Sequence, residues 1–270
     1  MNSIGCPLAA TVAYLFDEAP IPHLLWGWLA IALTGENNAS RRIEFVIPDE
    51  FIEIAGRTLQ EAGFPLCSNR ACPKLQHNRF NSPVPDVHFH LDEIDRYYNI
   101  LALYSKSSTV WWLPYFSMRP PAEDDPHFIL STDKRLPPRL PGGASGPWTE
   151  LYPIKTLKPN ALTEAVILLL VRDLNQPNGL DKWWKQLLAS LVEERELKEA
   201  IVHKTLRPEL QPFWTNFHAQ FPVVDQWVPL EELREKMMLR DELPSPPVLS
   251  ADGLLDEWVV VSVSSSSSSV

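Results

Sequence analysis

Two short segments of the sequence place ionisable side chains two residues apart, a spacing that suits chemistry on a β-strand. Residues 42–44 read Arg-Ile-Glu, and residues 86–90 read Asp-Val-His-Phe-His. Because residues i and i+2 of a strand face the same way, Asp86, His88 and His90 would share one face of a strand, as would Arg42 and Glu44. Carboxylates such as Glu44 and Asp86 are groups that can hold a metal ion. His88 and His90 could add nitrogen ligands or hydrogen bonds to a substrate. The alternative interpretation of the second segment is an amphipathic strand whose polar face lies in solvent.

The elements that must position Glu44 follow from the pattern of residues 23–63. A short apolar run ends at Gly27, a small-residue apolar segment and a turn at residues 35–38 follow, and residues 42–47 form a strand-like run. This order predicts a strand, a tight turn, a helix and a second strand. Pro48 and Asp49 then end the strand and open a helix that runs to Gly63, with one apolar face packed on the strands.

This order of elements resembles the nucleotidyltransferase fold, in particular the small fungal proteins that look like minimal nucleotidyltransferases. In that family a strand ends in Gly-Gly or Gly-Ser, and the next strand carries Asp-x-Asp or Asp-x-Glu. Gly27-Trp28 stands at the position of the glycine pair, and Arg42-Ile43-Glu44 stands at the position of the acidic pair. The resemblance implies a third carboxylate on a neighbouring strand, for which Asp86 is the best candidate by position.

The site implied by the resemblance has two kinds of residue. The metal ligands, which would hold Mg²⁺ and carry catalysis, are Glu44 and Asp86. The residues expected to contact the substrate are Gly27, Trp28, Arg42, His88 and His90.

Two positions depart from the family pattern. Arg42 replaces the first acid and changes the local charge by two units, and a unit pair at intermediate dielectric is worth roughly 4 kcal/mol. Trp28 replaces a small residue and would obstruct the close approach of a phosphate to the backbone. We therefore expect a catalytically impaired protein that binds a nucleotide, a small molecule or a protein partner. The alternative is an active Mg²⁺-dependent enzyme that moves a nucleoside monophosphate onto a hydroxyl or amine.

Two other metal sites can be considered from the sequence. Cys67, Cys72 and His77 offer three zinc ligands without the paired spacing of a structural site, so we expect ordinary thiols in a loop. A metal hydrolase built on His88 and His90 lacks its remaining ligands in any recognisable spacing.

Composition restricts the class of protein and of partner. The 270 residues are 45% hydrophobic and include 10 tryptophans, so the chain can bury a sizeable core. The net charge of −10 argues against broad binding to nucleic acid or anionic membranes. Three cysteines are too few for a secreted disulfide framework, and the first residues lack the basic segment of a signal peptide. These features favour a cytoplasmic, or alternatively nuclear, protein.

The whole chain reads as α+β, with a small mixed sheet and flanking helices followed by a helical half. We expect a nucleotidyltransferase-like domain over residues 1–150, a helical region packed on it over residues 151–242, and a disordered serine-rich tail over residues 243–270. Trp183 and Trp184 lie at helical spacing and are expected in the core rather than in base stacking. The expected helices cover residues 7–18, 49–63, 159–174, 181–204, 209–220 and 230–240, and the further expected strands cover residues 64–67, 86–91 and 127–131, with two strands joined by a turn within 98–113.

Overall fold

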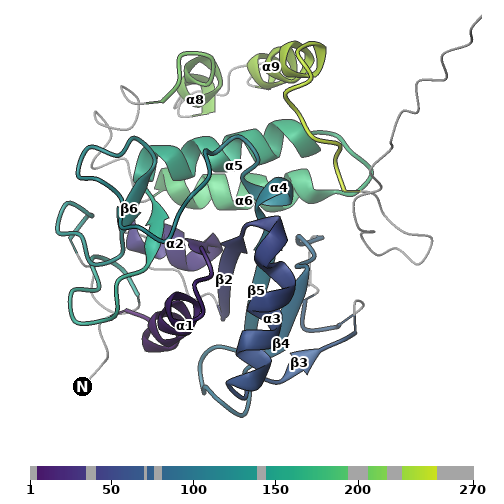
Figure 1. Cartoon of the computed structure of the whole chain (residues 1–270). Helices are drawn as coiled ribbons and strands as arrows, with labels where there is room; N and C mark the ends of the chain where they lie inside the picture. Colours follow the sequence, from purple (N-terminus) through teal and green to yellow (C-terminus); the bar gives the residue numbers. More distant parts are fainter. Residues whose placement is uncertain are drawn as a thin grey trace, which may run out of the picture.

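The computed structural model describes residues 5–34, 41–69, 72–75, 81–138, 144–193, 206–217 and 227–247. The expected turn at residues 35–38, His77, residues 194–204 of the expected long helix and the tail beyond residue 247 lie outside these ranges. Along the chain (Figure 1) the elements are α1 Pro7–Glu18, β1 Leu24–Trp26, α2 Gly27–Leu33, β2 Arg42–Ile47, the 3₁₀ helix η1 Asp49–Phe51, α3 Ile52–Glu61, β3 Leu66–Cys67, β4 Val87–His90, β5 Ile100–Ser105, α4 Lys106–Thr109, β6 Phe128–Leu130, β7 Lys155–Leu157, α5 Pro159–Asp173, α6 Leu180–Glu193, α8 Gln211–Phe217 and α9 Val228–Leu239.

The strands form one seven-stranded mixed sheet in the order β3-β4-β5-β2-β1-β7-β6. β2 runs parallel to β5 and β1 runs parallel to β7, whereas the other neighbours are antiparallel. The α+β class, with a small mixed sheet followed by helices, is confirmed. The sheet also includes β7, which we had not predicted, so it continues past residue 150 and the helices of the second half begin at Pro159.

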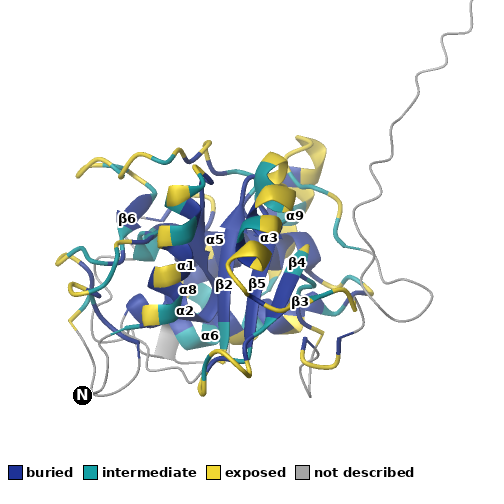
Figure 2. Ribbon diagram, turned by 60° about the horizontal axis from the view of Figure 1, so that its bottom comes forward, coloured by how far each residue is buried: buried dark blue, intermediate teal, exposed yellow. Residues whose placement is uncertain are grey.

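Helices cover both faces of the sheet. The alternation of β2 sends Ile43, Phe45 and Ile47 into a hydrophobic cluster shared with α1 and α3, whose outer sides are exposed (Figure 2). Glu44 and Val46 point to the opposite face, where α5 and α6 pack on the sheet. The helices α8 and α9 lie beyond α5 and α6 and form a further layer (Figure 1).

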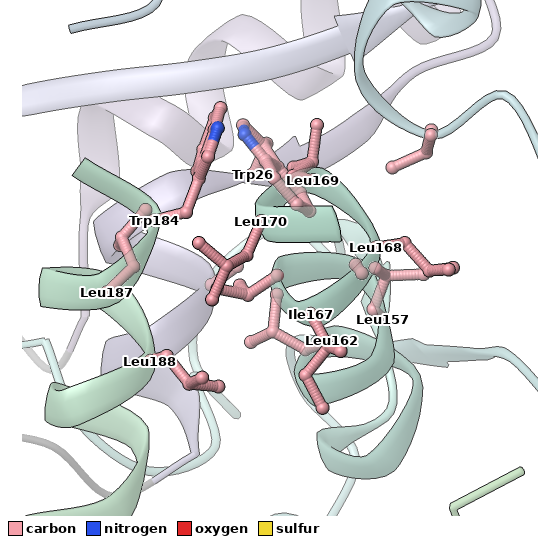
Figure 3. Close-up of a cluster of buried hydrophobic side chains, with 14 of the residues drawn as sticks. Trp26, Leu157, Leu162, Ile167, Leu168, Leu169, Leu170, Trp184, Leu187 and Leu188 are labelled. Carbon is pink, nitrogen blue, oxygen red and sulfur yellow. The ribbon is translucent and has the colours of Figure 1, made fainter. Parts of the chain in front are cut away.

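Helix α5 is the centre of the larger hydrophobic cluster. Every residue from 161 to 173 is buried, which agrees with the burial on most sides predicted from its near-continuous apolar run. Figure 3 shows Leu170 of α5 on the side of Leu187 and Leu188 of α6, with Trp26 and Trp184 at one end of the cluster. The two sequence halves therefore share one core, because α5 packs against the sheet on one side and against α6 and α9 on others.

The predicted pair of strands within residues 98–113 is wrong in its second half. β5 ends at Ser105, and the predicted turn is the single-turn helix α4. The Ser108 hydroxyl donates to the carbonyl of Ser105 at 3.0 Å, a local bond that competes with strand pairing. Among the described residues, no helix is long and apolar enough to cross a membrane.

Gly27 lies at the predicted turn between a strand and a helix, and its backbone conformation requires glycine. Its φ of +64° is in the left-handed region, which side chains disfavour. A Cβ atom built there would lie 1.8 Å from Oε2 of Glu44. The junction can therefore form because position 27 has no side chain, and its empty side is filled by the Glu44 carboxyl group.

Substitution of this glycine tests the close approach. Gly27→Ala is expected to destabilise the protein by about 3 kcal/mol or more, because backbone strain adds to a clash with a buried group. Gly63→Ala is the matched control, since Gly63 has a φ of +93° but no atom within 4 Å of its Cβ position. That substitution is expected to cost about 1–2 kcal/mol, for strain alone. Urea unfolding measures both, and equal losses would contradict the close approach.

Candidate functional site

A cavity of about 310 Å³ lies between one face of the sheet and the helices α5 and α6. Residues from β1, β2, β4 and β5 form its sheet side, and α5 and α6 form its other wall. The predicted site residues Gly27, Trp28, Glu44, Asp86 and His88 all line this cavity. Arg42 and His90 are not among the residues that line it in the described part of the chain.

The register of the sheet explains why these side chains share one face. Glu44 pairs with Ala102 of β5, and Ala102 pairs in turn with His88 of β4. Arg42 and His90 flank Ile100 in the same manner. Laterally paired residues point to the same side of a sheet, so Glu44 and His88 face the cavity together.

The expectation that the strand after Asp86 lies directly beside the strand of Glu44 is wrong. β5 lies between β2 and β4, and it places Ala102, a residue with no polar side chain, opposite Glu44. Asp86 comes one residue before β4, opposite Tyr104, so it is two strands across from Glu44 and displaced along the sheet. At about 4.8 Å per strand, the two backbones are roughly 10 Å apart across the sheet alone.

The Glu44 carboxyl group is buried and held by protein donors. Glu44 lies on the covered face of the sheet and is only 4% exposed. The backbone N–H of Trp28 donates to Oε2 at 3.3 Å, and the Tyr104 hydroxyl donates to Oε1 at 3.2 Å. Burial raises the pKa of Glu44 above its ordinary value, and the nearby charge of Arg42 and these two hydrogen bonds oppose the rise in part.

Arg42 is turned toward neighbouring backbone and an indole. Its Nη2 donates to the carbonyl oxygens of Leu75 at 2.5 Å and Lys74 at 3.4 Å. Its guanidinium carbon lies 5.6 Å from the ring centre of Trp183, within cation–π range. The same indole meets the edge of Trp28, with ring centres 6.4 Å apart. The two residues that depart from the family pattern thus meet at Trp183.

Asp86 binds the backbone at the end of β5. Its Oδ2 accepts a hydrogen bond from the N–H of Ser105 at 2.6 Å. Loss of hydration at the cavity wall raises the pKa of its carboxyl group, while hydrogen bonds from Ser105 act in the opposite direction. The Asp86 carboxylate is therefore bonded to the backbone of β5, while it also lines the cavity.

The two histidines of β4 have different surroundings. His88 is 4% exposed, and its Nε2 has no hydrogen-bond partner among the described residues. Burial and the nearby charges of His90 and Arg42 lower the pKa of His88 to about 4. His90 is half-buried, with its Nε2 3.2 Å from Sγ of Cys72. His90 thus contacts a cysteine thiol, whereas His88 has an unpartnered ring nitrogen among the described residues.

Sequence reasoning missed several polar groups of the site. Tyr104 lies at even spacing from Ile100 and Ala102 on β5, so a correct strand order would have placed it on the cavity face. At the end of α5, the buried Arg172 donates through Nε and Nη2 to the two carboxylate oxygens of Asp173, at 2.9 and 2.6 Å. Trp184 adds a third bond to Asp173 at 2.7 Å. The sequence feature that could have indicated this buried pair is the adjacent Arg172 and Asp173 at the end of an apolar run.

Comparisons with known proteins give one solved structure of interest. No protein-family model matches the chain, and no curated protein is significantly similar to it. The structure is similar to the crystal structure of an antigenic nucleotidyltransferase-like protein from Paracoccidioides brasiliensis. The two are 12% identical, with a TM-score of 0.41, over 88% of this chain and 92% of the other. The likeness is one of fold alone.

The buried carboxyl group makes a prediction about pH. Because the pKa of Glu44 is raised in the folded state, its protonated form stabilises the protein below the unfolded pKa, near 4.5, and this stability is lost as pH rises toward the folded pKa. The Glu44→Gln variant has no carboxyl group to ionise at this position and lacks this loss. The difference between its free energy of unfolding and that of the native protein should therefore shift in favour of the variant as the pH rises above 4.5. Denaturant unfolding at several pH values measures the difference. Glu61→Gln, an exposed change on α3, is the control, and a pH-independent difference for Glu44→Gln would contradict the prediction.

Proposed function

We propose that this protein binds a small organic molecule in the cavity and does not transfer nucleotides. One observation carries the proposal: both oxygens of the Glu44 carboxyl group accept hydrogen bonds from the protein itself, at the start of α2 and from β5. In a working transferase of the resembled kind, that carboxylate would have to hold a cation.

The residues present do not fit a Mg²⁺ site at Glu44. Mg²⁺ requires near-octahedral oxygen ligands and is usually held by carboxylates together with substrate phosphates. The strand beside Glu44 offers Ala102, and the next acid, Asp86, lies beyond it and is bonded to Ser105. Burial also favours the neutral form of Glu44, which is a poor cation ligand.

The groups that could bind phosphate in this region are engaged as well. The Trp28 N–H, at the expected position of the phosphate-binding turn, is directed at Glu44. The Arg42 guanidinium is directed at two backbone carbonyls and an indole. The two carboxyl groups that line the cavity, Glu44 and Asp86, offer no cationic partner to a triphosphate. A ligand without phosphates is therefore favoured over a nucleotide.

The lining of the cavity indicates the chemistry of that ligand. Indole rings of β1, α2 and α6 supply apolar walls, and Asp86, His88 and Tyr104 supply hydrogen-bonding groups. A volume of about 310 Å³ is at the lower end of the usual range for small-molecule sites. We infer a flat, mostly apolar molecule with N–H donors, such as a nucleobase or nucleoside.

The absence of transfer can be measured directly. Native protein incubated with Mg²⁺ and each radiolabelled nucleoside triphosphate is expected to label itself or an added acceptor no more than Glu44→Gln does. The reason is that Glu44 is held by Trp28 and Tyr104 and has no partner carboxylate on β5. Mg²⁺-dependent labelling by native protein that Glu44→Gln loses would overturn the proposal and establish an active enzyme.

Binding can be tested by filling the cavity. Val84, a half-buried residue that lines it, is changed to tryptophan, and Val228→Trp on the surface of α9 is the matched control. We expect at least one of adenosine, guanosine, cytidine and uridine to bind native protein and Val228→Trp, independently of Mg²⁺, and to bind Val84→Trp at least ~10-fold more weakly. Isothermal calorimetry gives the affinities. Equal binding to both variants would place the ligand elsewhere, and binding of triphosphates alone would contradict a phosphate-free ligand.

A further inference from the structure

Four potential metal ligands meet at the edge of the sheet next to the cavity. They are Cys67, Cys72, His88 and His90, and their ligand atoms all lie within 4.8 Å of one another. Strand pairing and the alternation of side chains along β4 bring three of them together. Cys67 of β3 is the direct cross-strand partner of His88, and His90 follows two residues later on the same side of β4.

The fourth member comes from the segment after β3. Cys72 is buried, and its Sγ lies 3.2 Å from Nε2 of His90. Its position is fixed by a backbone bond from Leu75 to the Cys72 carbonyl at 2.9 Å, and the Leu75 carbonyl in turn accepts from Arg42. The thiol therefore lies in a segment that is tied to β2 and faces the histidines of β4.

One buried polar atom in this cluster has no protein partner among the described residues. The Nε2 atom of His88 is buried and has no hydrogen-bond partner among the described residues, although His88 belongs to a cluster that contains two thiols. A buried polar atom without a partner is costly, and native structures normally satisfy it by a protein group, a water molecule or an ion. A metal ion held by the cluster would satisfy it.

We propose that Cys67, Cys72, His88 and His90 form a tetrahedral Zn²⁺ site. Two sulfur and two nitrogen ligands are the set that zinc prefers in closed structural sites, and the spacing of the two cysteines falls within the usual range for such sites. Zn–S distances near 2.3 Å and Zn–N distances near 2.0–2.1 Å place the ligand atoms of a tetrahedron about 3.3–3.8 Å apart. The upper limit of 4.8 Å on the observed separations exceeds these values by about 1–1.5 Å, which small rotations of the side chains can supply, and Sγ of Cys72 is already 3.2 Å from Nε2 of His90.

The charges of the site are consistent with the proposal. Two thiolates balance the double charge of the ion, and the two imidazole rings bind it as neutral nitrogen ligands. The sequence-based expectation of ordinary thiols in a loop rested on the absence of a paired ligand spacing, with His77 considered as the third ligand. The histidines of β4 replace it here, because antiparallel pairing of β3 with β4 places them beside Cys67.

The consequence of such a site is local. β3 has two residues, and a zinc ion would fasten it and the segment of Cys72 to β4. Cys67 and His88 also line the cavity, so the ion would fix one of its walls without entering the binding space. With four protein ligands the site has no open position, so its role is structural.

Metal content and spectra of the native chain give the first test. Protein purified without a metal-binding tag and under reducing conditions is expected to contain about one zinc ion per chain. Removal by a chelator and return of zinc at about 100 times the dissociation constant should raise the melting temperature by roughly 5–10 °C. Cobalt substitution should give the visible bands of a tetrahedral ion together with thiolate-to-cobalt charge transfer. Absence of zinc binding, or a cobalt spectrum without charge transfer, would overturn the proposal.

Matched substitutions give the second test. Cys72→Ser and His90→Gln are each expected to weaken zinc binding at least ~10-fold. Cys6→Ser and His127→Gln remove the same groups elsewhere, and Cys6→Ser retains an acceptor for the Ala9 N–H at the start of α1. Both controls should bind zinc as the native chain does. Equal zinc affinity in all four variants would exclude this cluster, and the cobalt spectrum decides the matter if a cluster variant fails to fold.

Discussion

The structure depends on a buried carboxyl group at the junction of β1 and α2. Glu44 occupies the space that a side chain at position 27 would need, and it accepts a hydrogen bond from the first turn of α2. Tyr104 bonds the other oxygen and connects the junction to β5. A single acid thus joins three elements of the sheet layer, and both of its carboxyl oxygens accept hydrogen bonds from the protein itself.

This arrangement divides one face of the sheet into two regions. Over β1 and β7, the helices pack on this face in a dense core of leucines and tryptophans. Toward β4 and β3 the face opens into the cavity, where polar groups from β4 and β5 face the helices. The buried Arg172–Asp173 pair lies at the boundary, where Arg172 also donates to the carbonyl of Ser108 and Trp184 donates to Asp173. Removing one member would leave an unpaired buried charge, so the boundary is held by electrostatics as well as by packing.

Local features of the fold were readable from the sequence. The turn at Gly27, the alternation of β2 and the apolar run of α5 each follow from neighbouring residues, and each agrees with the structure. The order of the strands did not follow, because it depends on where the chain crosses the sheet. Placing β5 between β2 and β4 separated Asp86 from Glu44 and brought Tyr104 to the site. β7 has three residues, too few for a recognisable period, and the cysteine–histidine cluster exists through cross-strand pairing that sequence spacing alone does not reveal.

The two outermost strands of the sheet are β3, with two residues, and β6, with three. An edge strand offers unpaired N–H and C=O groups to any other extended chain, and a long, flat edge promotes aggregation. Edges this short present few such groups, and the long strands β2 and β5 lie in the interior of the sheet. Within the described residues, the sheet therefore offers little edge for growth by strand addition.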